Sequence, residues 1–553
     1  MKKTFLYPVL GSLLYAGAAF AQQTEPVALP QIHGNFQVDA QYYNPDSLIG
    51  APKVNEKVLS NGFGNLNYRY GNFSAGMRYE SYQNVMQGYD SRYKGQGIPY
   101  RYARFKQKEI DITLGNFYEQ FGSGLIFRSY EARGLLYDNA MDGIRAIYNP
   151  FKGITFKGLI GKQRTFFSYS PGIVRGFDGE ININEMFDSL ATKKTKVIIG
   201  GSFVSKYQAD QDPTLVLPEN VGCYGGRINV IRGGFNFFTE YAYKINDPSL
   251  NNNNSFKDGQ GLFASASYAT DGLSLLFAGK YIDNMSYRSD RGAALSVAMI
   301  NFLPALSKPH TYMMMAFYPY ATQPNGELSY SGELQYKFKK GSLIGGATGM
   351  EVSLNYSASY ATDTTRLSKT GADSSHLYGY KINPYGLGPK YFEDLNIEIG
   401  KKLNKKLKLT LMGAMQFYND NVIRHSNPNG GYPNIYSTIG VIDVTYKYKH
   451  GSNIRFEAQT LQAHQDKGSW VSGVIEWTPS SNFFASIQDQ YNYANPEPDL
   501  RFHYYYGTVG FVHDETRITL SYGKLRAGIF CVGGVCRNVP ASNGLSLTIS
   551  SSF

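Results

Sequence analysis

The sequence has few tryptophans, no long apolar run beyond its N-terminus, and no change of composition that would mark a linker. Only 2 Trp occur among its 553 residues. After the first residues, no stretch offers the roughly 18 or more consecutive apolar side chains that a membrane-spanning helix needs, so transmembrane helices are excluded. No Pro-rich or Ser-rich linker and no charge block divides the chain, which favours one large unit over several soluble domains.

Recognisable catalytic motifs are also missing. The 8 His are scattered, without an H-E-x-x-H motif or a paired spacing that suits a metal ion. No G-x-S-x-G nucleophile elbow occurs, and the stretch FGSGL (121–125) lacks the Lys-Ser/Thr pair of a nucleotide-binding loop. We therefore expect no catalytic residues, no metal site, no cofactor and no nucleic-acid partner. An enzyme assembled from Ser and His on distant strands is a less favoured alternative.

The N-terminus predicts an exported protein. Lys2 and Lys3 precede an apolar run that ends in Ala19-Phe20-Ala21, the small-residue pattern that signal peptidase cleaves. No Cys lies at the cleavage point, which argues against a lipid anchor. We predict a signal peptide over 1–21 and a mature chain over 22–553.

The chain is rich in aromatic residues and glycine, and its polarity alternates. It holds 46 Tyr, 34 Phe and 59 Gly, a composition that indicates many strands joined by turns. Apolar and polar residues alternate in GNFQVDAQYY (34–43), SNIRFEAQTL (452–461) and TRITLSYGK (516–524). Because strand side chains point alternately to two faces, each segment has one apolar and one hydrophilic face.

The length of these segments separates two all-β folds. A soluble sandwich also alternates, but its strands usually have about five or six residues. Here the runs reach about 10 to 13 residues, the length that a tilted strand needs to cross a bilayer. Tyr and Phe gather at the ends of the runs, as in the aromatic girdles of outer-membrane barrels. We predict a single large antiparallel transmembrane β-barrel.

The C-terminus and the connections indicate location and size. The last segment, NGLSLTISSSF, ends in Phe553, and such a terminal aromatic resembles the sorting signal read by the outer-membrane assembly machinery. Short turns alternate with long polar loops, and in such barrels the short turns and both termini face the periplasm. The chain length allows an even number of about 22 to 26 strands. We expect an integral protein in the outer membrane of a Gram-negative bacterium, in contact with lipid and lipopolysaccharide.

A barrel of this size is wide enough to enclose a channel that conducts ions and solutes. Sixteen or more strands leave a channel unless a segment fills it. Too few residues lie between the predicted cleavage site and the first strand for a separate plug domain, so we expect none. Any constriction must come from loops folded inward or from a partner protein.

One stretch looks like a functional motif: LGNFYEQFGSGLIFRSYEARGLLYDNAMDGIR (114–145). Its alternation weakens, its glycines permit bends, and its charges cannot face lipid cheaply. We interpret 115–143 as a segment that folds partly inward at the barrel mouth, with a plain surface hairpin as the alternative. The candidate lumen and constriction residues are Glu119, Arg128, Glu131, Arg133, Asp138, Asp142 and Arg145.

Other polar positions suggest ion pairs and one disulfide. Cys531 and Cys536 flank VGGV in the last predicted outer loop, where an oxidising exterior permits a disulfide. Cys223 is left over as a small apolar residue. We interpret several polar-face carboxylates as lumen-wall charges paired with basic residues: Asp39, Glu240, Glu457 and Glu476 with Arg69, Lys244, Arg455 and Arg517.

The block at 114–145 and the following KGITFKGLIGKQR (152–164) resemble an uncharacterised family of outer-membrane barrel proteins, a domain of unknown function, from Bacteroidota-type bacteria. The resemblance extends over the mature chain. It implies the fold and the location, and it assigns no activity to particular residues.

Three functions are compatible with these features. The first is a pore or channel for solutes or oligosaccharides with inward-folded loops. The second is a non-enzymatic barrel subunit of an outer-membrane complex for secretion, surface attachment or nutrient uptake, whose long loops bind an unidentified partner protein. The third, and least favoured, is a barrel-embedded surface enzyme.

Overall fold

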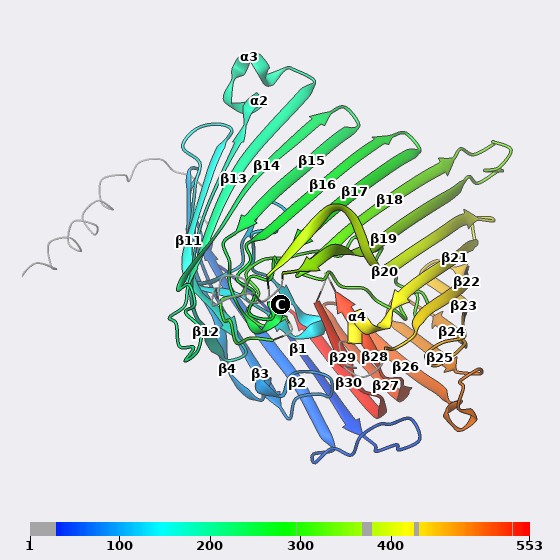
Figure 1. Cartoon of the computed structure of the whole chain (residues 1–553). Coiled ribbons are helices and arrows are strands. Elements are labelled where there is room, and N and C mark those ends of the chain that lie inside the picture. Colours follow the sequence, from blue (N-terminus) through cyan, green and yellow to red (C-terminus); the bar gives the residue numbers. More distant parts are fainter. Residues whose placement is uncertain (1–28, 295, 368–378, 425–430, 533–534) are drawn as a thin grey trace, which may run out of the picture.

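Twenty-four strands form one antiparallel sheet that closes on itself. The computed structural model describes residues 29–294, 296–367, 379–424, 431–532 and 535–553. The sheet closes because β1 (Gln31–Tyr43) pairs on one side with β2 (Val58–Tyr70) and on the other with the C-terminal β30 (Ser542–Ser552) (Figure 1). The prediction of one antiparallel barrel with an even number of strands is confirmed.

The wall strands follow one another around the barrel in chain order. Two of the connections between them contain short hairpins of their own. The other wall strands are β3 (Phe73–Gln83), β4 (Gly95–Lys106), β5 (Ile110–Phe117), β10 (Met141–Tyr148), β11 (Ile154–Thr165), β12 (Ser168–Asn182), β13 (Thr195–Tyr207), β14 (Asn220–Arg232), β15 (Phe235–Lys244), β16 (Gly259–Thr270), β17 (Leu273–Asp283), β18 (Gly326–Phe338), β19 (Met350–Arg366), β20 (Tyr380–Lys402), β21 (Leu407–Asn419), β22 (Asn434–Lys449), β23 (Ser452–Ala463), β24 (Trp470–Thr478), β25 (Phe483–Tyr491), β26 (His503–His513) and β27 (Thr516–Leu525).

The remaining elements are short and lie in the connections. No helix among the described residues has the length and apolar character needed to cross a membrane. The short strands are β6 (Gln120–Phe121), β7 (Phe127–Arg128), β8 (Glu131–Ala132), β9 (Tyr137–Asp138), β28 (Gly528–Val532) and β29 (Val535–Val539). The helices are α2 (Ile183–Met186), α3 (Asp188–Ala191) and α4 (Asp420–Arg424), with 3-10 turns at η2 (Ser91–Tyr93), η3 (Arg133–Leu135), η4 (Leu250–Asn252) and η6 (Pro498–Leu500).

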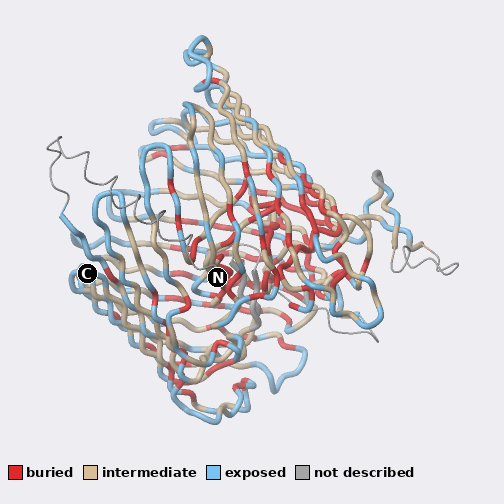
Figure 2. Tube along the Cα trace, turned by 90° about the vertical axis from the view of Figure 1, so that its left-hand side faces the viewer, coloured by how far each residue is buried: buried red, intermediate tan, exposed pale blue. Residues whose placement is uncertain are grey.

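Alternation along each strand produces an apolar outer face and a polar inner face. In β5, Ile110, Ile112 and Leu114 are exposed on the outside, whereas Asp111 and Thr113 are buried on the lumen side. Residues opposite each other in neighbouring antiparallel strands share a face, so the strand register extends this assignment around the wall. Figure 2 shows that buried residues concentrate along one part of the wall and in the chain beside it.

One predicted loop is shorter than expected. The polar stretch 362–390 has the composition of one of the long polar loops, but β19 continues to Arg366 and β20 begins at Tyr380. Thr364 pairs with Ile382 in this extension, and β-branched residues of this kind favour strands. The two strands therefore continue past the wall as a hairpin.

Three sequence predictions remain predictions. The signal peptide lies outside the described residues. The backbone of β28 and β29 places Cys531 opposite Cys536, but both side chains lie outside the described ones. Phe553 is 70% exposed, and its backbone exchanges two hydrogen bonds of 2.9 Å with Gly34 of β1. This contact does not test its role in sorting.

Replacing Ile487 with Lys should destabilise the membrane-embedded barrel by about 2–4 kcal/mol, because Ile487 lies at the middle of β25 on the outer face and is 60% exposed. The neighbouring Ser486 points into the lumen, so Ser486→Lys should have a much smaller effect. Urea titration in lipid vesicles, followed by the heat-dependent shift in gel migration, measures both variants. Equal losses of stability would contradict the assigned faces.

Candidate functional site

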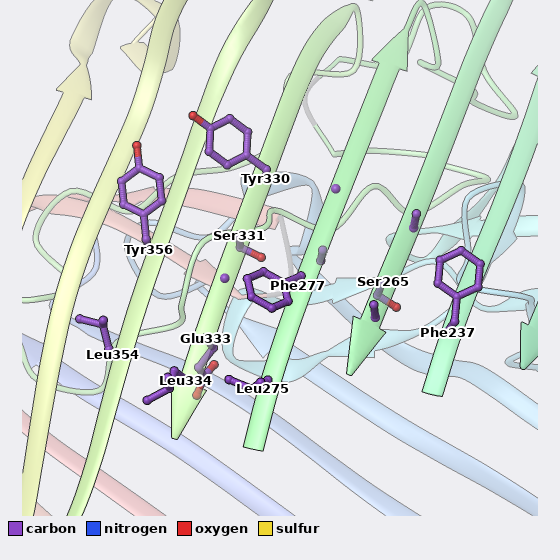
Figure 3. Close-up of a pocket in the computed structure, with 15 residues that line it drawn as sticks. Phe237, Ser265, Leu275, Phe277, Tyr330, Ser331, Glu333, Leu334, Leu354 and Tyr356 are labelled. Carbon is purple, nitrogen blue, oxygen red and sulfur yellow. The ribbon is translucent and has the colours of Figure 1, made fainter. Parts of the chain in front are cut away.

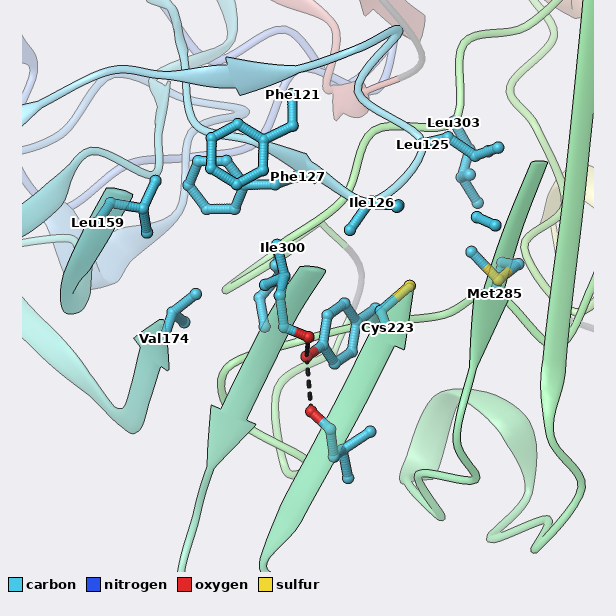
Figure 4. Packing of buried hydrophobic residues seen from close by; sticks show 14 of the residues in the cluster. Phe121, Leu125, Ile126, Phe127, Leu159, Val174, Cys223, Met285, Ile300 and Leu303 are labelled. Carbon is cyan, nitrogen blue, oxygen red and sulfur yellow. Dashed lines mark hydrogen bonds between the residues drawn. The ribbon is translucent and has the colours of Figure 1, made fainter. Parts of the chain in front are cut away.

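Two connections turn into the barrel and pack against the lumen side of its wall. The first lumenal loop, residues 118–140, joins β5 to β10, and the second lumenal loop, residues 284–325, joins β17 to β18. Figure 4 shows Leu125 and Ile126 of the first loop beside Met285 and Ile300 of the second, above the wall strands. All four side chains are buried, and each such side chain contributes about 1.5–3 kcal/mol to holding the loops in place.

Glycines in the wall make room for the first lumenal loop. A Cβ added to Gly225 of β14 would lie 2.1 Å from Cδ1 of Ile126, and one added to Gly176 of β12 would lie 2.8 Å from the ring of Phe121. Larger side chains at these wall positions would collide with the loop. The two glycines therefore act as sockets that receive Ile126 and Phe121.

The two lumenal loops are joined to each other through their backbones. The amide of Arg128 donates to the carbonyl of Ile300 at 2.9 Å, and the amide of Phe302 donates to the carbonyl of Gly124 at 2.9 Å. The guanidinium of Arg128 also lies 4.0 Å from the centre of the Phe302 ring. The loops therefore form one packed body inside the barrel.

The candidate residues at the start of the predicted block hold the first loop to the wall. Glu119 pairs with Arg145 of β10 at 3.3 Å and with Lys157 of β11 at 2.9 Å. Arg145 also pairs with Asp111 of β5 at 3.0 Å. These charges are mostly buried and partnered.

A second charge cluster holds the far part of the first loop. Asp138 pairs with Arg78 of β3 and with Arg164 of β11, the latter at 2.7 Å. Glu131 pairs with Arg78 at 3.0 Å and with Arg133 at 2.8 Å. Because Arg78 and Arg164 also pair with Glu80, the cluster joins the loop to two separate parts of the wall.

Two of the predicted candidates behave differently from the rest. Arg133 is nearly half exposed, and its guanidinium lies 4.2 Å from the centre of the Phe63 ring of β2. Asp142 lies on the β10 face that carries the exposed Ile144, whereas a lumen position was expected, and it pairs with the exposed Arg101 at 3.3 Å. Strand alternation explains this difference, because β10 begins at Met141 and Asp142 is three residues from the inward-facing Arg145.

The second lumenal loop crosses to the opposite part of the wall. His310 Nε2 lies 2.8 Å from a carboxylate oxygen of Asp394 on β20, and the Tyr312 hydroxyl donates to Asp443 on β22 at 2.9 Å. Nearer the start of this loop, burial lowers the pKa of Arg288 to about 10, although Tyr137 opposes the shift. This loop was not recognised as a lumenal segment from the sequence. Its Met-rich stretch (313–317) carries no charge and is the signal that could have identified it.

The predicted wall ion pairs are partly correct. Arg455 pairs with Glu457, as expected, and also with Glu476, whereas Arg517 lies over the Phe484 ring at 4.6 Å. Glu240 does not pair with Lys244, because four residues along a strand span roughly 13 Å. Glu240 instead accepts a hydrogen bond of 2.6 Å from the amide of Ser123 in the first loop.

Asp39 is also paired differently from the prediction. It accepts hydrogen bonds of 2.8 Å from Gln37 and from Thr548 on β30, and the predicted partner Arg69 lies further along the barrel, opposite Gln31. Asp39 is thus held by uncharged donors.

One part of the lumen wall is covered by the two loops only at its edges, where Arg133 lies over Phe63 of β2 and the second-loop cluster packs against Tyr504 of β26. We call the lumen face of β25, β26, β27, β30, β1 and β2 the open strip. Hydrogen bonds between neighbouring strands link its side chains, such as Thr508 to Ser521 at 2.9 Å and Asn65 to Asn35 at 2.8 Å. A cavity of about 390 Å³ lies between this strip and the first lumenal loop. The cavity is lined from both sides, by Gln37, Asn61, Tyr506, Ser546 and Thr548 of the strip and by Arg133 and Leu136 of the loop.

Another hollow lies on the outer surface of the barrel. Figure 3 shows Phe237, Phe277, Tyr330 and Tyr356 around a recess of about 610 Å³ that spans β15 to β19. The strand register places these side chains on the apolar outer face. The recess therefore faces the membrane and is not part of the lumen.

The whole chain, residues 1–553, matches a sequence family described as "Family of unknown function (DUF6029)". The chain belongs to this family. No curated protein matches this DUF6029 member. Among described residues, no group of three or more His, Cys, Asp or Glu side chains is arranged to hold a metal ion.

Several solved outer-membrane proteins are similar to this DUF6029 member. The outer membrane protein opdK from Pseudomonas aeruginosa has 8% identity and a TM-score of 0.36, with 95% of this chain and 98% of that chain covered. OccAB3 from Acinetobacter baumannii has 10% identity and a TM-score of 0.36, with 95% and 99% covered. A mutant of the ferric enterobactin receptor PfeA from Pseudomonas aeruginosa has 10% identity and a TM-score of 0.41, with 95% and 80% covered.

Replacing Gly225 with Leu should displace the first lumenal loop, because the new side chain would occupy the space of Ile126. The matched control is Gly226→Leu, since Gly226 is exposed on the other face of β14 and a Cβ there meets no atom closer than 4.0 Å. Limited proteolysis of the folded protein should cleave within 118–140 in the first variant only. Equal protection of the loop in both variants would contradict the socket.

Proposed function

We propose that this chain is a narrowed channel for solutes in the outer membrane of a Gram-negative bacterium of the Bacteroidota type. The observation that carries the proposal is the division of the lumen. Two packed loops cover one part of the wall, whereas the open strip is covered only at its edges and borders a cavity between it and the first loop. Barrels of 16 or more strands are wide enough for an aqueous channel, and 22-stranded barrels hold a plug. The lumen of this 24-stranded barrel is partly filled, so it is neither fully open nor fully plugged.

The outer surface supports a membrane location. A closed barrel satisfies the backbone hydrogen bonds of its strands within the wall, which is the requirement for strands in a bilayer. Exposed apolar side chains such as Leu114, Ile487 and Val509 cover the outer face. Lipid and lipopolysaccharide are the partners that this surface fits.

The connections support an orientation with both termini in the periplasm. β1 begins and β30 ends at the side of the barrel where short turns such as 71–72 and 514–515 occur. Both lumenal loops enter from the opposite, long-loop side. In this orientation they narrow the channel from the side of the cell exterior, and Phe553 is available to the assembly machinery in the periplasm.

We infer transport without catalysis. The titratable groups that the two lumenal loops bring together are used in holding the loops. Glu119 and Asp138 are bound by basic residues of the wall, and His310 is bound to Asp394. The proposed role needs no metal ion and no cofactor.

Deleting residues 119–134 should increase single-channel conductance by about twofold or more, because the first lumenal loop would no longer narrow the lumen. The barrel should still close, since Phe117 and Met141 are direct cross-strand partners and the remaining residues can join them. Planar-bilayer recordings of the purified protein give the conductance.

The control for this experiment is deletion of residues 211–217 in the connection between β13 and β14. This connection lies at the same end of the barrel but contributes nothing to the buried cluster. Conductance should then match that of the unmodified protein. If neither the unmodified protein nor the 119–134 deletion conducts, the channel function is wrong.

One observation favours a second candidate function, the non-enzymatic subunit of an outer-membrane complex. The hairpin of β19 and β20 continues past the other wall strands and offers a surface for a partner protein. Its far end is fixed, because Tyr380, in the last cross-strand pair of the hairpin, donates its hydroxyl to Asp283 of β17 at 2.5 Å. Co-purification that is lost when Tyr380 is replaced by Phe, without any change in conductance, would favour this candidate.

A further inference from the structure

We propose that the open strip selects uncharged, polyhydroxylated solutes, namely neutral mono- and oligosaccharides, over ions and charged solutes. The inference rests on the channel function proposed above and names its class of solute.

The side chains of the open strip are almost all uncharged hydrogen-bonding groups. Gln37, Thr508, Thr519, Ser546 and Thr548 all lie on the lumen face and are partly exposed. Among the described lumen-facing residues of β25, β26, β27, β30 and β1, Asp39 is the one carboxylate. Its charge is already shared with two donors.

The charged side chains of the lumen are concentrated on the covered wall. Arg145, Lys157 and Glu240 face the lumen on β10, β11 and β15, and each contacts the first lumenal loop. A solute that moves along the open strip therefore meets few fixed charges. Rings of fixed charge are what give a pore its selectivity for ions, so this path has little means of favouring an ion.

The chemistry of the strip matches that of a sugar. Hydroxyl and amide side chains both donate and accept hydrogen bonds, as the hydroxyls of a sugar do. The cavity beside the strip adds aromatic surface from Tyr89 and Tyr506, on which the apolar face of a sugar ring can rest. The charged side chains that line its loop side are paired with one another, Arg133 with Glu131 and Arg164 with Glu80 and Asp138. Its volume of about 390 Å³ lies within the range of small-molecule sites.

A short peptide fits this path less well. At neutral pH its two termini carry opposite charges, and the strip would have to bind both. Among the described residues of the strip, Asp39 is the one carboxylate available to bind the amino terminus of a peptide. The peptide's carboxylate would have to bind Arg517, which is nearer the short-turn end and whose guanidinium lies 4.6 Å from the centre of the Phe484 ring.

The test is a swelling assay with the full mature chain in liposomes. The probes are glucose, maltose and a neutral trisaccharide, with gluconate and glucosamine as charged solutes similar in size to glucose, and glycylglycine as the peptide. The expected result is that glucose enters at least about threefold faster than gluconate and glucosamine. Maltose should also enter faster than glycylglycine relative to free diffusion.

Two lysine variants, one in the strip and one away from it, locate the path. Thr548→Lys places a cation in the strip beside the cavity, and it should reduce maltose entry severalfold and raise gluconate entry relative to glucosamine. The matched control is Ser353→Lys, which places the same charge on the lumen face of β19, away from the strip. Maltose entry should be unchanged in this control. Heat-dependent gel migration verifies that both variants are folded.

The outcomes separate this inference from the proposed channel. Equal entry of glucose, gluconate and glucosamine would overturn the sugar selectivity and leave the channel standing. Faster entry of glycylglycine than of maltose would replace the sugar with a peptide. Equal effects of Thr548→Lys and Ser353→Lys would overturn the strip as the path. Entry of no probe at all would overturn both the channel and its selectivity.

Discussion

The packing of the first lumenal loop into glycine sockets of the wall is the contact on which the rest of the lumen depends. Ile126 and Phe121 occupy space that a side chain at Gly225 or Gly176 would fill. The second lumenal loop is then built on the first, through backbone hydrogen bonds at Ile300 and Phe302. Without this contact, a wall of 24 strands would enclose a far wider opening.

Charge has a structural use in this barrel. Removing one partner of a buried ion pair costs about 3–5 kcal/mol. Clusters such as Asp138 with Arg78 and Arg164 therefore raise the free energy needed to displace the first lumenal loop. The same clusters place the fixed charges on one part of the wall. The open strip is left with mostly neutral groups. The placement of the charged residues on one part of the wall therefore explains both how the loops are held and why the path carries few charges.

The barrel could be predicted from the sequence because its signal is local. Each strand carries its own alternation, and the alternation over 452–461 gave the correct faces of β23, with Phe456 exposed outside and Glu457 on the lumen side. The inward bend of the first loop also followed from charges that cannot face lipid cheaply. The structure joins two of the candidate residues, Glu119 and Arg145. Asp142 was misplaced because a count of charges ignores the face of the strand on which each one lies.

The remaining features depend on contacts that are distant in sequence. Nothing in the sequence around Gly225 indicates that the space beside it holds the side chain of Ile126, about a hundred residues earlier in the chain. The second lumenal loop is stabilised by strands on both sides of the barrel, including Asp394 and Asp443. The open strip is defined by what the loops leave uncovered, so it could be recognised only after both loops were placed.

The most direct test of a lumen divided into covered and open walls is the rate at which single cysteines react with a membrane-impermeant thiol reagent. The background replaces Cys531 and Cys536 with Ser and keeps Cys223, which is fully buried. Cysteines introduced at Thr508 and Thr548 should react quickly, and cysteines introduced at the buried Val204 and Ala242 should react at least about a hundredfold more slowly. Equal rates at all four positions would contradict the account.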